Sequence, residues 1–173
     1  TTAALGILID EKKIKWDDKV IDYIPEFRLY SPYVTEEFTI RDLLTHRSGL
    51  GLGAGELMIW PGLNNFTLND IIHNLRYLKP VSGFRTKYDY DNLLYIVAGE
   101  VIARVSGTSW ENFIETRIMQ PLNMTNSAAA VIGAAAGAVG STGSSALDCV
   151  HRLATLSGRT ARFSLAATGT LFA

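Results

Sequence analysis

The sequence contains a single cysteine, Cys149, which excludes an internal disulfide and matches no spacing of zinc ligands. No apolar run reaches the roughly 18 residues that a membrane-spanning helix requires. The net charge of −1 points to neither a nucleic acid nor an anionic membrane as a partner. His73 and His151 have no acidic or histidine partner at metal-binding spacing. We therefore expect no metal and no cofactor. With 173 residues, 47% of them hydrophobic, the chain can still bury a core of one domain's size.

Charged and large side chains are also scarce at the C-terminal end. Residues 127–173 hold only four charged side chains, and 30 of these 47 residues are Ala, Gly, Ser or Thr. We therefore predict a boundary between a folded region, residues 1–126, and an atypical tail, residues 127–173. The tail either packs on something else or is truncated, deleted or frame-shifted. Within it, residues 147–156 could form a helix and residues 163–171 a strand.

Apolar residues at helical spacing predict several helices before the tail. The first spans residues 1–11 and has no cap of its own, and a short second one runs to Tyr23, with Asp17 or Asp18 as its cap. Thr39 and Thr67 each open a later helix. Thr39, with Asp42 three residues on, comes close to a capping box. Further helices follow at residues 92–105 and after Ser109.

The stretch at residues 88–100, YDYDNLLYIVAGE, is a polar loop that turns directly into the longest apolar helix. It places the phenol of Tyr90 and the carboxamide of Asn92 two residues apart at the start of that helix. Each has a simpler reading: Tyr90 as an aromatic packed at a helix start, and Asn92 as a helix N-cap. His46 is a possible base, but its position after a helix favours a role in satisfying the turn there.

Three segments in the same order resemble the β-lactamase-related serine hydrolases, which include class C β-lactamases, penicillin-binding DD-carboxypeptidases and esterases. They are TAALGILIDEKKIKWDDKV at Thr2–Val20, FTIRDLLTHRSGL at Phe38–Leu50 and the segment Tyr88–Met124. The resemblance implies an α+β, β-lactamase/transpeptidase-like fold, of which this chain is mainly the helical lobe. It also implies that Tyr90-Asp91-Asn92 is the middle one of three catalytic motifs, in its Tyr-x-Asn form.

The other two motifs of that family are absent. No serine is followed by lysine three residues later, and neither K-T-G nor H-x-G occurs near the C-terminus. The resemblance implies an S-x-x-K just before Thr1, whose serine attacks and whose lysine shares proton transfer with Tyr90. Tyr90 and Asn92 would be catalytic, and Tyr88 would line the substrate pocket. Without the lysine, we expect Tyr90 to be a neutral phenol that donates a hydrogen bond.

Together these features predict a fragment of a serine hydrolase that acts on amide or ester bonds through an acyl-enzyme. Its substrates would be β-lactams, D-Ala-type peptides or esters. The alternative is a catalytically inactive relative that serves as a binding module. The family resemblance further implies a periplasmic, secreted or envelope-associated protein. The isolated chain is predicted to carry out no acyl transfer, because it has no nucleophile.

Overall fold

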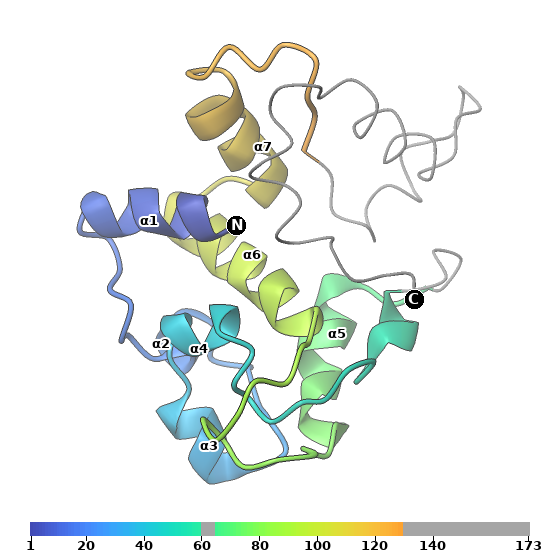
Figure 1. The fold of residues 1–173 in the computed structure, drawn as a ribbon. Coiled ribbons are helices and arrows are strands. Elements are labelled where there is room, and N and C mark those ends of the chain that lie inside the picture. The colour runs from blue at the N-terminus through green and yellow to red at the C-terminus, as the bar shows by residue number, and fades with distance from the viewer. Residues whose placement is uncertain (60–64, 130–173) are drawn as a thin grey trace. The chain divides into compact units, whose positions relative to one another are not determined.

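The computed structural model describes residues 1–59 and 65–129, which fold as helices joined by loops (Figure 1). These residues form no strand, and Lys19 and Thr39 meet in an isolated antiparallel bridge. The helices are α1 (Thr2–Asp10), α2 (Val20–Tyr23), α3 (Pro32–Glu37), α4 (Ile40–Leu44), α5 (Leu68–Asn74), α6 (Leu93–Ser106) and α7 (Trp110–Ile114). Two 3₁₀ turns, η1 (Glu56–Met58) and η2 (Leu75–Tyr77), and a π-helical turn, η3 (Glu115–Met119), complete them. None of the described helices is long and apolar enough to cross a membrane.

Three helix starts have the caps that the sequence predicts. Thr39 and Asp42 form a complete capping box, in which the Thr39 hydroxyl accepts from the Asp42 amide and the Asp42 carboxylate accepts from the Thr39 amide. Thr67 forms an equivalent box at α5, and the Ser109 hydroxyl caps α7. Each such cap contributes about 1 kcal/mol, because it satisfies backbone N–H groups that have no partner within the helix.

Two local predictions are wrong or incomplete. Neither Asp17 nor Asp18 caps α2, whose N-cap is Lys19 with no side-chain hydrogen bond. Asp18 instead accepts hydrogen bonds from the Lys15 amide and from the Tyr23 hydroxyl, both at 2.7 Å. Helix α3 was not predicted, although Ser31 caps it and a proline occupies its first turn, a pattern typical of helix starts. The helix and strand expected at residues 147–156 and 163–171, and most of the tail, lie outside the described residues.

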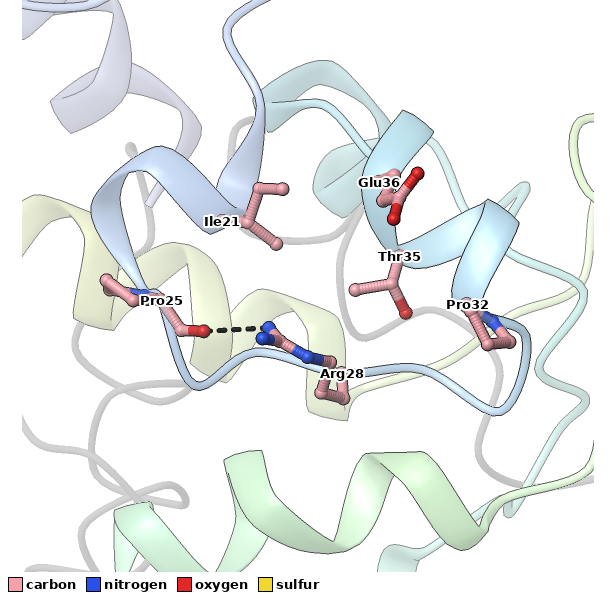
Figure 2. Close-up of a pocket in the computed structure, with 6 residues that line it drawn as sticks. All are labelled: Ile21, Pro25, Arg28, Pro32, Thr35 and Glu36. Carbon is pink, nitrogen blue, oxygen red and sulfur yellow. Dashed lines mark hydrogen bonds between the residues drawn. The ribbon is translucent and has the colours of Figure 1, made fainter.

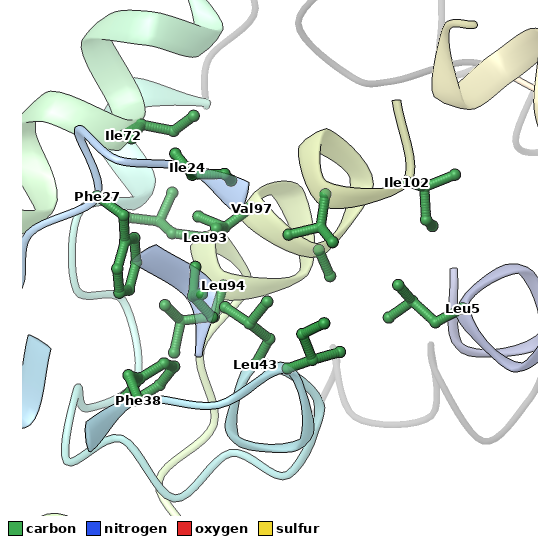
Figure 3. Packing of buried hydrophobic residues seen from close by; sticks show 14 of the residues in the cluster. Leu5, Ile24, Phe27, Phe38, Leu43, Ile72, Leu93, Leu94, Val97 and Ile102 are labelled. Atoms are coloured by element: carbon green, nitrogen blue, oxygen red, sulfur yellow. The ribbon is translucent and has the colours of Figure 1, made fainter. Parts of the chain in front are cut away.

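Helix α6 lies at the centre of the described residues and contacts α1, α2, α4, α5 and α7 (Figure 1). Its buried positions recur at helical spacing and point into one hydrophobic core, part of which Figure 3 shows. That core includes Leu5 from α1, Leu43 from α4 and Ile72 from α5, all fully buried. Burying each such side chain stabilises the fold by about 1.5–3 kcal/mol relative to exposure. The start of α6 is therefore firmly held by its surroundings.

The loop before α6 is joined to α4 by an ion pair. The Arg85 guanidinium donates to both carboxylate oxygens of Asp42, at 2.9 and 2.6 Å, and stacks over the Phe84 ring. Asp42 is buried and its pKa is lowered below the ordinary value, since the hydrogen bonds from Arg85 and Thr39 outweigh the cost of burial. The ion pair therefore fixes residues 84–85 against the start of α4 and brings the following residues close to the other end of that helix.

Candidate functional site

The side chains of Tyr90 and Asn92 are joined by a hydrogen bond just before α6. The Tyr90 hydroxyl donates to Asn92 Oδ1 across 2.8 Å, and both side chains are partly buried. The structure thus brings together the two residues that the sequence singled out as catalytic. Their roles in a reaction stay predictions.

Asp91, rather than Asn92, provides the side-chain cap of α6. Asn92 occupies the N-cap position but has helical backbone angles and makes no capping hydrogen bond. The Asp91 Oδ1 atom accepts from the Leu94 amide at 3.1 Å. The interpretation of Asn92 as the N-cap is therefore right about its position and wrong about its side chain, which makes no capping hydrogen bond. Because Asp91 takes the capping role, the carboxamide of Asn92 is left for other partners.

Glu56, at the start of η1, is the second partner of Asn92. Asn92 Nδ2 donates to Glu56 Oε1 at 2.8 Å, so the amide is held at both its oxygen and its nitrogen ends. A carboxamide nitrogen carries two hydrogens, of which this bond uses one. Sequence patterns did not indicate Glu56, because it lies 36 residues from Asn92 and follows no motif. It belongs to the site only through the fold.

His46, which follows α4, also faces this site. Its ring centroid lies 4.7 Å from that of Tyr90, 5.3 Å from that of Tyr95 and 5.4 Å from that of Tyr88. Its Nδ1 atom accepts from the Asp91 amide at 3.2 Å. We expected the His46 ring to satisfy the turn at the end of its own helix. This expectation is wrong, because the ring accepts from the loop before α6.

Tyr88 lies at the outer side of this cluster. Its side chain is 65% exposed, and its ring meets the His46 ring in an edge-on contact. The exposed phenol therefore contacts His46, whose ring also packs on Tyr90. A substrate-binding role for Tyr88 stays a prediction.

Burial and the neighbouring Glu56 carboxylate govern the protonation of Tyr90 and Asp91. Burial raises the pKa of Tyr90 above its ordinary value, and Glu56 adds to this effect. Burial also raises the pKa of Asp91 to about 7, again with a contribution from Glu56. Within the described residues, no lysine or arginine is among the groups that shift either pKa. Tyr90 is therefore a neutral hydrogen-bond donor here, and a cation placed beside it would favour the phenolate.

A separate pocket of about 310 Å³ lies between α2 and α3 and is shown in Figure 2. Its lining residues are Ile21, Pro25, Arg28, Pro32, Thr35 and Glu36. The Arg28 guanidinium donates to the carbonyl of Pro25, which also lines the pocket, and to the carbonyl of Phe27. None of the predicted site residues lines this pocket, so the Tyr90 corner remains the candidate site. The described residues also contain no cluster of three or more side chains suited to a metal.

Comparison with known proteins places the chain in a family. Residues 1–172 match the family described as Beta-lactamase. The chain belongs to the beta-lactamase family. The predicted family is thereby confirmed, and the Tyr90–Asn92 pair lies in the Tyr-x-Asn motif through which the sequence resembled it.

Several individual proteins are also similar to this chain. An unguisins hydrolase of Aspergillus violaceofuscus is 30% identical over 132 residues, which cover 73% of this chain and 23% of that protein. A penicillin-binding protein of Bacillus subtilis is 32% identical over 126 residues, which cover 70% of this chain and 27% of that protein. The crystal structure of a D-stereospecific amidohydrolase from Streptomyces sp. matches with a TM-score of 0.60 at 25% identity, over 70% of this chain and 39% of that one.

The chain spans about a quarter of the length of these curated relatives. The predicted fold class is confirmed as well, since the structural neighbours have the β-lactamase/transpeptidase fold and the described residues consist of helices and loops without a strand. The chain therefore represents mainly the helical lobe of a beta-lactamase-family protein.

Proposed function

We propose that the protein of which this chain forms part is a serine hydrolase that cleaves amide or ester bonds through an acyl-enzyme. The observation that carries the proposal is the hydrogen bond between the Tyr90 hydroxyl and Asn92 Oδ1 at the start of α6. Membership of the beta-lactamase family, which contains hydrolase and amidohydrolase relatives, supports the reaction class.

Acyl transfer requires a nucleophile, a group that moves protons and donors that orient the substrate. In this proposal Tyr90 moves the proton between the attacking serine and the leaving group. Asn92 holds the neighbouring lysine through Oδ1 and the acyl side of the substrate through its second N–H. Glu56 fixes the plane of the Asn92 amide, because it accepts the other N–H at 2.8 Å.

The lysine has a specific electrostatic task in this scheme. Tyr90 is surrounded by phenols and by the Glu56 carboxylate, and its pKa is raised, so alone it is a poor base at neutral pH. An ammonium group beside the phenol would reverse that effect and lower the pKa. The 173-residue chain has no serine with lysine three residues on, so by itself it is expected to catalyse no acyl transfer.

The test compares this chain with the full-length product of its gene, referred to here as the extended protein. Both are incubated with a p-nitrophenyl ester, a chromogenic cephalosporin and a D-amino acid anilide, and acyl adducts are sought by intact-mass spectrometry. We expect turnover and an adduct only in the extended protein. Tyr90→Phe should lower the rate by about 10²–10⁴-fold, the usual contribution of a proton-transferring group.

Tyr95→Phe is the matched control, because the Tyr95 hydroxyl donates to the Leu44 carbonyl at 3.1 Å and takes no part in the Tyr90–Asn92 pair. It should retain most of the activity. Equal rates in the two variants would contradict the assignment of Tyr90. Turnover by the 173-residue chain that survives in Tyr90→Phe would contradict both the site and the need for a separate nucleophile.

A further inference from the structure

His46 has an unusual backbone conformation that turns its ring towards the site. Its φ angle is +53°, in the left-handed region that non-glycine residues seldom adopt. Its carbonyl accepts from the Asp89 amide at 2.7 Å, so main chain from the loop before α6 docks on this residue. The strained turn is therefore held by the same loop that carries Tyr90 and Asn92.

The ring of His46 makes a second connection to that loop. Nδ1 accepts from the Asp91 amide, the residue between Tyr90 and Asn92, at 3.2 Å. A ring nitrogen accepts a hydrogen bond only while it carries no proton, so this bond requires neutral imidazole with its hydrogen on Nε2. The ring also packs on Tyr90, at 4.7 Å between centroids, and on Tyr95 from the first turn of α6, at 5.3 Å.

We propose that His46 is a positioning residue for the Tyr90–Asn92 pair, and that it holds the intervening Asp91 amide only while Nδ1 is unprotonated. A protonated Nδ1 would place an N–H against the Asp91 N–H and force the loop away from the ring. The pair would then lose its fixed place at the start of α6. The protonation-dependent contact between His46 and Asp91 does not depend on the proposed function. Only its importance for catalysis rests on that function.

The groups around the ring leave His46 neutral near physiological pH. From the loop, Tyr88 and Tyr90 face it as phenols, and the Asp91 carboxyl is turned to the Leu94 amide. From α6, Tyr95 faces it with its hydroxyl bonded to the Leu44 carbonyl. Burial lowers the pKa of His46, and no charged side chain is among the causes of that shift. The contact is therefore expected to weaken as the pH falls from about 6.5, the ordinary histidine value, through the lower pKa of the folded state.

The first experiment is an NMR titration of the ¹⁵N-labelled 173-residue protein, in which the ring nitrogens report protonation and tautomer. His73 is the internal control, because its ring is exposed and lies beside Tyr77 alone among the aromatic pairs of the described residues. We expect His46 to remain in the Nε2–H tautomer at about pH 6.5, the ordinary histidine pKa, because burial lowers its own pKa. The Tyr90 ring and Asn92 side-chain signals should shift with His46 and not with His73. Titrating Asp91→Asn in parallel removes the nearby carboxyl transition.

The second experiment compares two substitutions that separate the hydrogen bond from the ring packing. His46→Asn places an amide oxygen near the position of Nδ1 and tolerates the positive φ, whereas His46→Phe keeps an aromatic ring without an acceptor. Hydrogen exchange of the Asp91 amide should accelerate about three- to tenfold in His46→Phe, as expected for the loss of one hydrogen bond, and much less in His46→Asn.

Equal Asp91 exchange in the wild type and in folded His46→Phe would overturn the proposal. A His46 ring that gains its proton without any change in the Tyr90 signals would overturn it too. If His46→Phe does not fold, the titration of the unsubstituted protein decides the question alone. Because neither experiment uses a substrate, the two proposals can fail separately. An extended protein that is inactive in every assay would refute the proposed function, and a coupled titration in the 173-residue chain would still retain this inference.

Discussion

The Asp91 carboxyl should make the stability of the chain depend on pH in an unusual direction. Its side chain is 1% exposed, Oδ1 accepts from the Leu94 amide, and Oδ2 has no hydrogen-bond partner among the described residues. Burial raises its pKa from 3.8 to about 7. The folded chain therefore binds this proton more tightly than the unfolded chain does. Between these two pKa values the folded state holds more protons, and the contribution of Asp91 to stability falls as the pH rises.

The expected size follows from the two pKa values. Each tenfold difference in proton affinity corresponds to about 1.4 kcal/mol, so ionised Asp91 costs about 4 kcal/mol relative to protonated Asp91. Asp91→Asn keeps an oxygen for the Leu94 amide but cannot ionise. We expect the variant and the wild type to be similar at about pH 4 and the variant to be more stable by up to about 4 kcal/mol at about pH 9.

Urea unfolding followed by tryptophan fluorescence at several pH values measures this difference. Asp70→Asn is the matched control, because Asp70 is also a capping carboxylate but is exposed, and its hydrogen bonds with Thr67 lower its pKa. The Asp70 carboxylate stabilises the fold above the pKa of the unfolded state, and this contribution is lost as the pH falls. The Asp70→Asn variant should therefore be less stable than the wild type at neutral pH and equally stable in acid. An Asp91→Asn difference that is constant with pH, or that grows towards acid, would refute the reasoning.

Three further substitutions test the structure around the site by urea unfolding. Arg85→Ala should lower the free energy of unfolding by about 1–3 kcal/mol, because buried Asp42 loses its charged donor, and no loss would contradict the ion pair. Gly55→Ala should lower the free energy of unfolding more than Gly107→Ala, since both glycines have positive φ but only a Cβ at position 55 would clash with the Leu93 side chain of α6. Equal losses would be the contrary result. Leu94→Ala should cost about 2–5 kcal/mol through a core cavity, and a loss below about 1 kcal/mol would show that its site is not packed as described.

Much of the helical framework could be predicted because its signals are local. The boxes at Thr39 and Thr67, the Ser109 cap and the apolar periodicity of α6 are all patterns within a few residues of the chain. Local patterns gave a wrong prediction at α2, where Asp17 and Asp18 precede the helix but neither caps it. There Asp18 is engaged by the Tyr23 hydroxyl, a contact that depends on how the segment folds back on itself.

The candidate site also has one part that the sequence predicts and another that only the fold determines. The sequence alone determined that a phenol and a carboxamide stand together at the start of an apolar helix, because Tyr90 and Asn92 are two residues apart. Only the tertiary structure brought Glu56 and His46 to them, from 36 residues before Asn92 and 45 residues before Asp91. Local spacing fixes which groups share a helix start, whereas packing of α4 and η1 against α6 decides which distant side chains complete their hydrogen bonds and set their pKa values.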